Sequence, residues 1–566
     1  MKFAFQLPVL CLLGFRIASA QTEPRSLIFS GNYQNGEFDS LTFVNSVVGW
    51  DLFFNSNFRG RSTVIGNIEA GHVWSGHDAF VREPGALNGV TTFNSTAPGA
   101  LNQLDFHATM VGHILAGSGY IPDNGGAYTY AGLGMAPEAA LVSGAVAVGF
   151  SNTELGSFST TRESVVSVYE AFFQGIGVAK PDVINSSWGG DDPSASSPEV
   201  LAIDGLARQN STVAFVVSAG NGGDDVVSAP ASGFNNISVG SLGGTGFLEP
   251  SAFSSRGAAD FFNPVTGETL TGVRSAVDIA APGERMALAA YLGNQGSIAA
   301  SIPGMVEPTP PVGEYFLNMD GTSFAAPIVT GGVALLKDAG NTLLAGNPEA
   351  MDTRVIKSVI MAASQKTIGW DNGQNAMNET TQALDSRSGA GALDLVAAAD
   401  VYYFGTTGDA SMGIEATGWD SSTVNLGAGF EYVFASEFSE SMAVTVALNW
   451  FSVTDFDAIT GSGSEVAFSN LDLEVWSVDG SGQFLAKVGE SSSTYNNTEF
   501  LRIDSLDAGR YGFRVLFDSK VFDTTNAVME ETFGLAWRAV PVPEPASSIL
   551  AALGGLWLLR RRRCNE

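Results

Sequence analysis

The chain has 566 residues, which is long enough for more than one domain. Hydrophobic residues make up 45% of it and charged residues 15%, and this balance excludes a disordered protein. The formal net charge of −31 excludes a nucleic-acid-binding protein, which would carry the opposite sign. Both cysteines, Cys11 and Cys564, lie near the ends, so removal of the two ends would leave a protein without a disulfide.

Residues 1–20 have the pattern of a secretory signal peptide. Lys2 precedes an apolar run over residues 3–15, and Ala18-Ser19-Ala20 supplies the small residues of a cleavage site. The run is short for a membrane span and Arg16 interrupts it, which argues against an N-terminal anchor. We therefore expect a secreted protein that begins at Gln21.

Between residues 21 and 400, apolar runs alternate with helical segments. We predict strands over residues 64–69, 139–148, 182–188, 212–219, 237–242 and 277–280. Several runs are apolar at successive positions, which is typical of parallel strands buried on both faces. Helices are predicted over 198–208, over 328–337 and from a capping box at 160–163 to about Gly175, while the proline-rich residues 301–313 indicate a loop. The alternation predicts an α/β domain with a doubly wound parallel sheet.

The pattern changes over residues 401–540. Large apolar residues alternate with smaller or polar ones over 442–450, 471–475 and 511–517. Turn pairs such as Asp479-Gly480 and Ala508-Gly509 separate such segments. Period-two alternation with turns predicts a C-terminal antiparallel β-sandwich, for which we expect a binding or spacing role.

Residues 541–566 combine three sorting features. They are Pro543-Glu544-Pro545, an apolar run over 546–559 and four arginines at 560–563. In this order they resemble a PEP-CTERM sorting tail with a short hydrophobic helix and a basic cluster. The resemblance implies transient membrane anchoring, cleavage by an exosortase-type enzyme, and delivery to the cell surface or extracellular matrix. A plain C-terminal anchor is the alternative, although the run is short for a span.

Two segments carry the features of a hydrolytic site. All four histidines lie between positions 72 and 113, and His107 is predicted to open a helix. Ser323 lies in Asp320-Gly321-Thr322-Ser323-Phe324-Ala325-Ala326-Pro327, immediately before the second apolar helix. Pro327 is tolerated only near a helix start, where unpaired N–H groups favour a developing oxyanion.

These segments resemble blocks of the subtilisin-like serine peptidases, the subtilases, and the resemblance covers about residues 60–400. Further matching blocks follow in the family's order: Gly134-Met135-Ala136-Pro137, Asn185-Ser186-Ser187-Trp188-Gly189, Ser218-Ala219-Gly220-Asn221, Asp278-Ile279-Ala280-Ala281-Pro282-Gly283 and Gly389-Ala390-Gly391. The resemblance implies a serine endopeptidase that acts on protein or peptide substrates.

The resemblance also assigns roles to individual residues. Ser323 is the expected nucleophile, His107 the general base and Asn221 the oxyanion donor. The expected substrate-binding residues are Ser187, Trp188, Gly189 and Gly220. Trp188 could equally be a packing residue. The short stretch from Gln21 to the first strand leaves no room for the family's usual inhibitory pro-domain.

One position departs from the family pattern. The family's acid is an aspartate followed by Ser or Thr and Gly, whereas this chain has Glu69-Ala70-Gly71 at the end of the first strand. Glutamate carries the same charge and can orient an imidazole, so we expect Glu69 to be the acid. Asp105 is the weaker candidate because it lies only two residues before His107. The alternative is a decayed domain that acts as a surface binding protein.

We expect no required cofactor and no catalytic metal. His72, His77 and His113 are interpreted as structural residues, since no His-Glu-x-x-His pattern is present. A metal-dependent hydrolase built on the histidines is the rival class. Acidic loops such as residues 455–457 could hold a structural Ca²⁺, although solvated carboxylates are the simpler interpretation.

Overall fold

A computed structural model of the protein describes residues 42–542, apart from 84, 87, 123–127, 152–155, 297–314 and 404–412, together with the pairs 26–27, 29–30, 33–34 and 37–38. The predicted signal peptide, the loop over residues 301–313 and the tail from residue 543 onward lie outside these residues.

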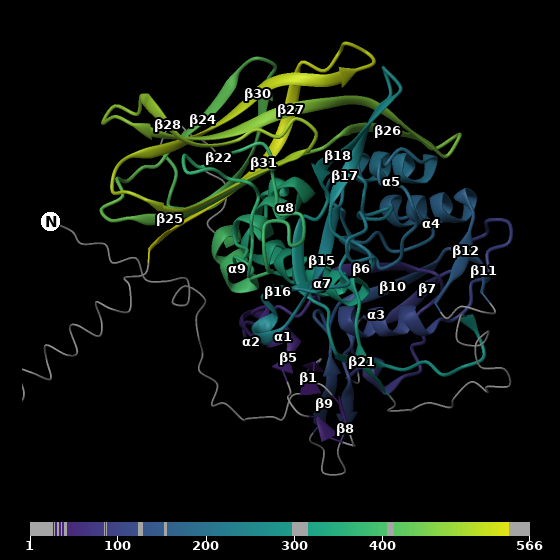
Figure 1. Ribbon diagram of the computed structural model, residues 1–566. Coiled ribbons are helices and arrows are strands. Elements are labelled where there is room, and N and C mark those ends of the chain that lie inside the picture. The colour runs from purple at the N-terminus through teal and green to yellow at the C-terminus, as the bar shows by residue number, and fades with distance from the viewer. Residues whose placement is uncertain are drawn as a thin grey trace, which may run out of the picture.

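The first part of the fold is built around one mostly parallel sheet (Figure 1). Its strands in spatial order are β16 (Glu249–Pro250), β15 (Ile237–Gly243), β14 (Ala214–Ser218), β13 (Val183–Ser186), β6 (Val64–Glu69), β10 (Ala140–Ala145) and β7 (Val90–Phe93), with β19 (Ile279–Pro282) also paired to β15. Strand β16 is the antiparallel member, at one edge. The predicted parallel α/β sheet is confirmed: β6 has the predicted bounds, β13 and β14 are shorter than predicted, and β15 ends one residue later.

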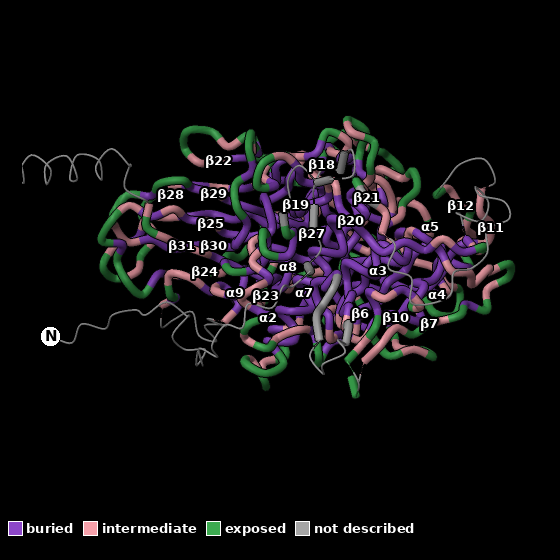
Figure 2. Tube along the Cα trace, turned by 90° about the horizontal axis from the view of Figure 1, so that it is seen from below, coloured by how far each residue is buried: buried purple, intermediate pink, exposed green. Residues whose placement is uncertain are grey.

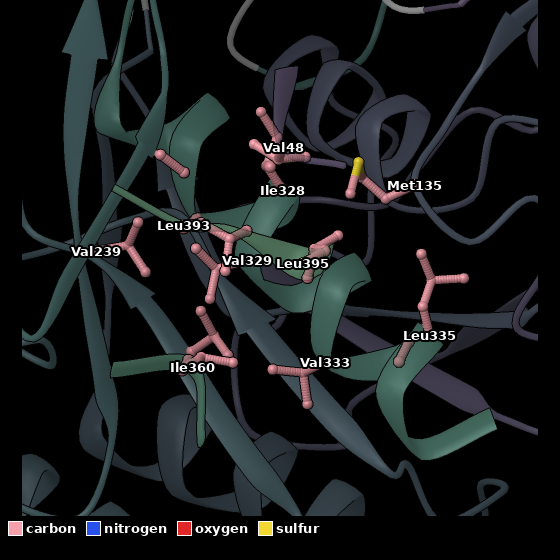
Figure 3. Close-up of a cluster of buried hydrophobic side chains, with 14 of the residues drawn as sticks. Val48, Met135, Val239, Ile328, Val329, Val333, Leu335, Ile360, Leu393 and Leu395 are labelled. Carbon is pink, nitrogen blue, oxygen red and sulfur yellow. The ribbon is translucent and has the colours of Figure 1, made fainter. Parts of the chain in front are cut away.

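Helices cover both faces of this sheet. They are α1 (Val44–Val47), α2 (Trp50–Asn55), α3 (Phe106–Ala116), α4 (Arg162–Gln174), α5 (Pro198–Gln209), α7 (Thr322–Leu343), α8 (Thr353–Ala362) and α9 (Leu395–Tyr403). Successive strand residues point to opposite faces: Val183 joins the core that contains α3 and α7, whereas Ile184 joins the core of α4 and α5. Side chains of α7 such as Ile328 and Val333 lie at the centre of the first core (Figure 3).

Local signals set several of the element ends, and three expectations need correction. Helix α4 ends at Gly175, whose φ of 73° is the left-handed conformation that glycine adopts readily. Its N-cap is Thr161, which accepts from the N–H of Ser164, and not Thr160 as the capping box predicted. The predicted strand over 139–148 divides into β10 and β11 (Ala147–Phe150), and the helix predicted over 328–337 is only the middle of the longer α7.

Two further sheets make up the C-terminal part. One has the order β22 (Glu379–Thr380), β28 (Phe484–Ser491), β27 (Ser462–Val478), β30 (Tyr511–Asp523) and β24 (Gly429–Val433), with β26 (Val453–Asp457) paired to β27. The other has the order β23 (Thr417–Asn425), β31 (Glu530–Pro541), β25 (Met442–Trp450) and β29 (Thr498–Leu506). Apart from the parallel pair β22–β28, the pairings are antiparallel. Alternating side chains such as Leu473, Phe513 and Trp537 build one core shared by both sheets.

The remaining strands form small sheets at the periphery. They are β1 (Ser26–Leu27), β9 (Tyr128–Leu133) and β8 (Tyr120–Pro122); β21 (Tyr315–Met319), β20 (Met286–Ala289), β2 (Phe29–Ser30) and β5 (Thr42–Phe43); β11 with β12 (Phe158–Thr160); β17 (Ala258–Asn263) with β18 (Glu268–Ser275); and β3 (Tyr33–Gln34) with β4 (Glu37–Phe38). Short 3₁₀ turns occur at η2 (Asp78–Phe80), η3 (Thr245–Phe247) and η4 (Pro348–Met351).

The C-terminal sheets pack directly on helices α5 and α8. A Cβ atom on Gly463 of β27 would lie 2.0 Å from the carbonyl carbon of Leu201 in α5, so the two backbones touch there. The buried Asn235 and Ser452 exchange two hydrogen bonds across the same boundary, at 3.0 and 2.9 Å. Buried residues extend through both parts of the molecule (Figure 2). The sheets are therefore a fixed part of the body and not a module on a free linker.

Candidate functional site

The predicted site residues converge at one edge of the parallel sheet. Glu69 is the last residue of β6, and Ser187 follows the last residue of the neighbouring β13. His107 and Ser323 are each the second residue of a helix, α3 and α7. Carboxyl ends of parallel strands and the starts of the following helices meet at the same edge, which is where α/β folds bind ligands.

Glu69 and His107 form a direct contact. The Oε2 atom of Glu69 lies 3.0 Å from Nδ1 of His107. The second carboxylate oxygen, Oε1, accepts the main-chain N–H of Ser187 at 2.8 Å. Glu69 is fully buried, whereas the side chain of His107 is 27% exposed and faces the cleft. Both oxygens of the carboxylate are thus held, and one of them orients the imidazole.

The environment of His107 favours its protonated form. Burial alone lowers the pKa of the imidazole, but the hydrogen bond to Glu69 and the charges of Glu69 and Asp105 outweigh it, so the pKa lies above its usual value. Asp105 contributes charge and is the N-cap of α3. Its Oδ2 atom accepts from the N–H groups of His107, at 3.1 Å, and Ala108, at 3.3 Å.

Ser323 lies in the first turn of α7, almost buried. Its hydroxyl donates to the carbonyl oxygen of Ser187 at 3.2 Å. The rings of His107 and Phe324 are 6.0 Å apart, which places His107 beside the start of α7. Ser323 is therefore close to the Glu69–His107 pair, with its hydroxyl bonded to Ser187.

Asn221 is held by Thr322, the residue before Ser323. Its Oδ1 atom accepts from both the main-chain N–H and the hydroxyl of Thr322, each at 2.9 Å. The acceptor end of the amide is thereby engaged, which leaves the Nδ2 end to donate to a substrate oxygen. The preceding Gly220 has a φ of 109°, and its N–H donates to the Thr322 hydroxyl at 3.1 Å.

The site lines a cleft of about 310 Å³. All eight predicted catalytic and substrate-binding residues belong to its walls: Glu69, His107, Ser187, Trp188, Gly189, Gly220, Asn221 and Ser323. Trp188 both lines the cleft and packs, since its ring lies 5.9 Å from Phe158 and 6.5 Å from Tyr169.

Sequence reasoning missed several residues of this cleft. Phe158, the first residue of β12, and Ser228, in a loop, line it in segments whose sequence carries no recognisable signal. Thr322 belongs to the Gly-Thr-Ser block, yet its contact with Asn221 depends on residues 101 positions apart and could not be inferred from spacing.

Of the three remaining histidines, His72 is buried, and His77 and His113 have direct polar contacts. His113 is buried, and its Nε2 lies 2.8 Å from the carbonyl oxygen of Gly132 while Nδ1 accepts the N–H of Ala289. Nδ1 of His77 lies 2.8 Å from the Asp78 carboxylate. Within the described part of the chain, no three His, Cys, Asp or Glu residues are grouped so that they could hold a metal ion.

The acidic residues 455–457 have protein partners in this structure. Asp455 pairs with Arg208 of α5 at 2.8 Å, and Asp457 accepts hydrogen bonds from Ile459 and Thr460 in its own turn. None of the helices that the structure describes is long and apolar enough to cross a membrane.

Comparisons with known proteins point to a peptidase family. The model of the subtilase family matches residues 82–391, a segment that includes His107, Asn221 and Ser323 and begins after Glu69.

Among solved structures, the prenylagaramide maturation protease PagA is 20% identical, with 62% of this chain and 98% of that chain covered and a TM-score of 0.42. The self-cleaved protease domain of PatA is 21% identical over 60% and 96% of the two chains, with a TM-score of 0.37. MycP1 without its N-terminal propeptide is 21% identical over 63% and 96%, also with a TM-score of 0.37. No curated protein matches the chain.

Proposed function

Because the family model spans more than half of the chain, the protein belongs to the subtilase family and is a serine-type endopeptidase, and we propose that Ser323, His107 and Glu69 are its catalytic triad. The observation that carries this proposal is the 3.0 Å contact between Glu69 Oε2 and His107 Nδ1 beside the start of α7. An anionic partner at Nδ1 keeps the proton there and leaves Nε2 free to accept one.

The proposed reaction starts with rotation of the Ser323 hydroxyl from the Ser187 carbonyl toward His107. Nε2 of His107 takes the proton as Oγ attacks the peptide carbonyl carbon. The Asn221 amide and the N–H groups at the start of α7 stabilise the oxyanion that forms. His107 then gives the proton to the leaving amine, and water repeats the steps on the acyl-enzyme. Glu69 remains ionised and stabilises the imidazolium.

Two measurements test this mechanism against the alternative of a decayed surface binding protein. A fluorophosphonate should label Ser323 in the folded protein, and mass spectrometry of a casein digest should show new peptide ends. EDTA should not affect either result, because the proposed chemistry uses no metal. A folded protein that neither labels nor cleaves would favour the binding protein, and inhibition by EDTA would favour a metal-dependent hydrolase or a structural Ca²⁺.

The cleft supports a preference for small side chains at the residue before the cut. A Cβ on Gly189 would lie 2.6 Å from the Ser228 hydroxyl, and one on Gly220 would lie 3.0 Å from it, so Ser228 fills the space between these two segments. Ser228→Gly should open this space and raise kcat/KM for Leu relative to Ala at this position by about tenfold, the scale of one or two buried methylenes. Ser481→Gly, in an exposed turn of the C-terminal part, is the matched control. An unchanged Leu-to-Ala ratio would place the side-chain pocket elsewhere.

We also propose that the protein is secreted and released to the cell surface or extracellular matrix by an exosortase-type enzyme. The sequence features at both ends support this proposal: a signal peptide over residues 1–20 and a PEP-CTERM tail. Intact-mass analysis of surface-exposed protein should give a start at Gln21 and an end near Pro543 or Pro545, without Cys564. Peptides containing the arginines at 560–563 in that material would contradict processing and would favour a plain anchor.

The C-terminal sheets, which we propose to be a β-sandwich, brace the peptidase part. Support comes from the backbone contact between Gly463 and Leu201 and from the hydrogen bond of the Ser358 hydroxyl in α8 to the carbonyl oxygen of Gly534 in β31, at 2.8 Å. A binding or spacing role can coexist with this contact through the opposite surface of the sheets.

A further inference from the structure

Beneath the proposed triad lies a chain of polar side chains that the mechanism above does not use. Asn67 of β6, Asn185 of β13 and Thr330 of α7 are all completely buried. Polar groups in such a place destabilise a fold unless each one is paired, and a fully paired network favours one arrangement of the elements that carry it. The contacts of each member therefore decide what the network holds in place.

The amide of Asn185 is fixed from both ends. Its Oδ1 atom accepts from the Thr330 hydroxyl at 3.0 Å, a proton that the hydroxyl shares with the carbonyl oxygen of Ala326. Its Nδ2 group donates one proton to Oδ1 of Asn67 at 3.2 Å and the other to the hydroxyl of Ser187 at 3.1 Å. Reversal of the amide would bring two oxygens together at Asn67, and again at Ser187, whose hydroxyl donates to Ser323, so these two contacts set its orientation and the Thr330 hydroxyl then pairs with Oδ1.

Ser187 connects the Asn185 amide to two members of the proposed triad. Having accepted from Asn185, its hydroxyl donates to the main-chain carbonyl oxygen of Ser323 at 3.0 Å. That carbonyl would normally bond to the N–H four residues later, but residue 327 is a proline and has none. The main-chain N–H of Ser187 meanwhile holds Oε1 of Glu69. One residue thus positions the start of α7 and the carboxylate that orients His107.

The other end of the network reaches the helix of the base. Nδ2 of Asn67 lies 3.5 Å from the carbonyl oxygen of Ala108, the residue after His107. The network therefore contacts β6, α3 and α7, which carry Glu69, His107 and Ser323, and β13, which Ser187 directly follows.

We propose that Asn185, held by Thr330 and Asn67, is a positioning residue that holds the nucleophile helix and the Glu69 carboxylate in register through Ser187. This proposal rests on the proposed triad. Because the network touches the reacting groups and not the substrate-binding segments beyond Ser187, its loss lowers kcat and leaves KM nearly unchanged. Small displacements of reacting groups are costly, and a misplacement of about 1 Å can cost about 10²-fold in rate.

Thr330→Val tests the proposal, because valine keeps the shape of the side chain and removes the proton donor. We expect kcat to fall by about 10- to 100-fold with KM within about twofold, and the rate of fluorophosphonate labelling at Ser323 to fall in proportion. Thr330→Ser restores the hydroxyl and should recover most of both rates. If Thr330→Val does not fold, Asn67→Leu removes the other partner of the same amide and should give the same split between kcat and KM.

Ser358→Ala is the matched control, since it removes a buried hydroxyl from α8 that contacts the C-terminal sheets and not the triad. It should lower the melting temperature and leave kcat unchanged. The contradicting result is a folded Thr330→Val protein that keeps the wild-type kcat although its melting temperature is lowered as in Ser358→Ala. The network would then be purely structural and the proposal wrong. A wild-type protein that neither labels nor cleaves would instead overturn the triad, and the positioning role with it.

Discussion

Ser323→Ala should remove peptidase activity while leaving the fold intact. Loss of the nucleophile lowers kcat in triad peptidases by about 10⁶-fold, which would leave only background hydrolysis. The structural cost is small, because the side chain makes one hydrogen bond, to the Ser187 carbonyl, and such a bond contributes about 1 kcal/mol. Rates on the peptides found in the casein digest, measured beside thermal unfolding curves, provide the test.

Ser197→Ala is a matched control for this substitution. Ser197 also stands at a helix start, where its hydroxyl accepts from the N–H of Val200 and caps α5. Its loss should cost about 1 kcal/mol of stability and no activity. Retention of more than a few per cent of wild-type kcat in a purified Ser323→Ala protein, with fluorophosphonate labelling abolished, would show that another group performs the hydrolysis.

The fold was predictable wherever the sequence signal is local. The apolar run of β6 and the cap and glycine of α4 depend only on neighbours in sequence, and their elements were placed to within one or two residues. The division of the 139–148 run was not predictable, because it depends on pairing with distant segments: β10 pairs with β6, whereas β11 pairs with β12.

The site was predictable as a set of residues but not as a geometry. Ordered motifs named the residues that line the cleft, yet nothing in them indicates that the Ser323 hydroxyl turns to Ser187. The hydrogen bond between Thr330 and Asn185 joins residues 145 positions apart. In the sequence, neither residue differs from an ordinary helix or strand residue. From the sequence, Gly463 is expected only to weaken its strand. In the structure, its lack of a side chain lets β27 touch α5.

The second large effect is expected at Glu69. In Glu69→Gln, the main-chain N–H of Ser187 still requires an acceptor, so the amide oxygen should occupy the place of Oε1. The amide NH₂ group would then face Nδ1 of His107 and donate to it, which moves the imidazole proton to Nε2, the atom that must accept from Ser323. We expect kcat to fall by about 10³–10⁴-fold, the scale of the equivalent change in a Ser-His-Asp triad.

The pH profile of Glu69→Gln separates this role from a structural one. His107 must be neutral to act as a base, so in the wild type kcat/KM should fall as the pH drops through a His107 pKa that lies above its usual value. The variant loses the anion that raises this pKa and keeps the burial that lowers it. The acid limb of its profile should therefore move to lower pH. A change that only loosened the fold would reduce activity without this shift.

Asp105→Asn is the matched control, because asparagine can still cap α3 while the second nearby charge is removed. It should leave kcat within a few fold of wild type. Should Asp105→Asn abolish activity and Glu69→Gln spare it, Asp105 would be the acid.

Glu69→Asp tests whether the site is adapted to the longer side chain of glutamate. The glutamate reaches two anchors at once, the Ser187 N–H at 2.8 Å and His107 Nδ1 at 3.0 Å, from the end of a strand held on both sides by β10 and β13. An aspartate is one methylene shorter and cannot meet both unless the strand moves. We expect kcat to fall by at least about tenfold, or roughly 1.4 kcal/mol of transition-state stabilisation. A decayed site predicts the reverse, a nearly inactive wild type in which Asp restores cleavage, and that result would show that Glu69 was never the working acid.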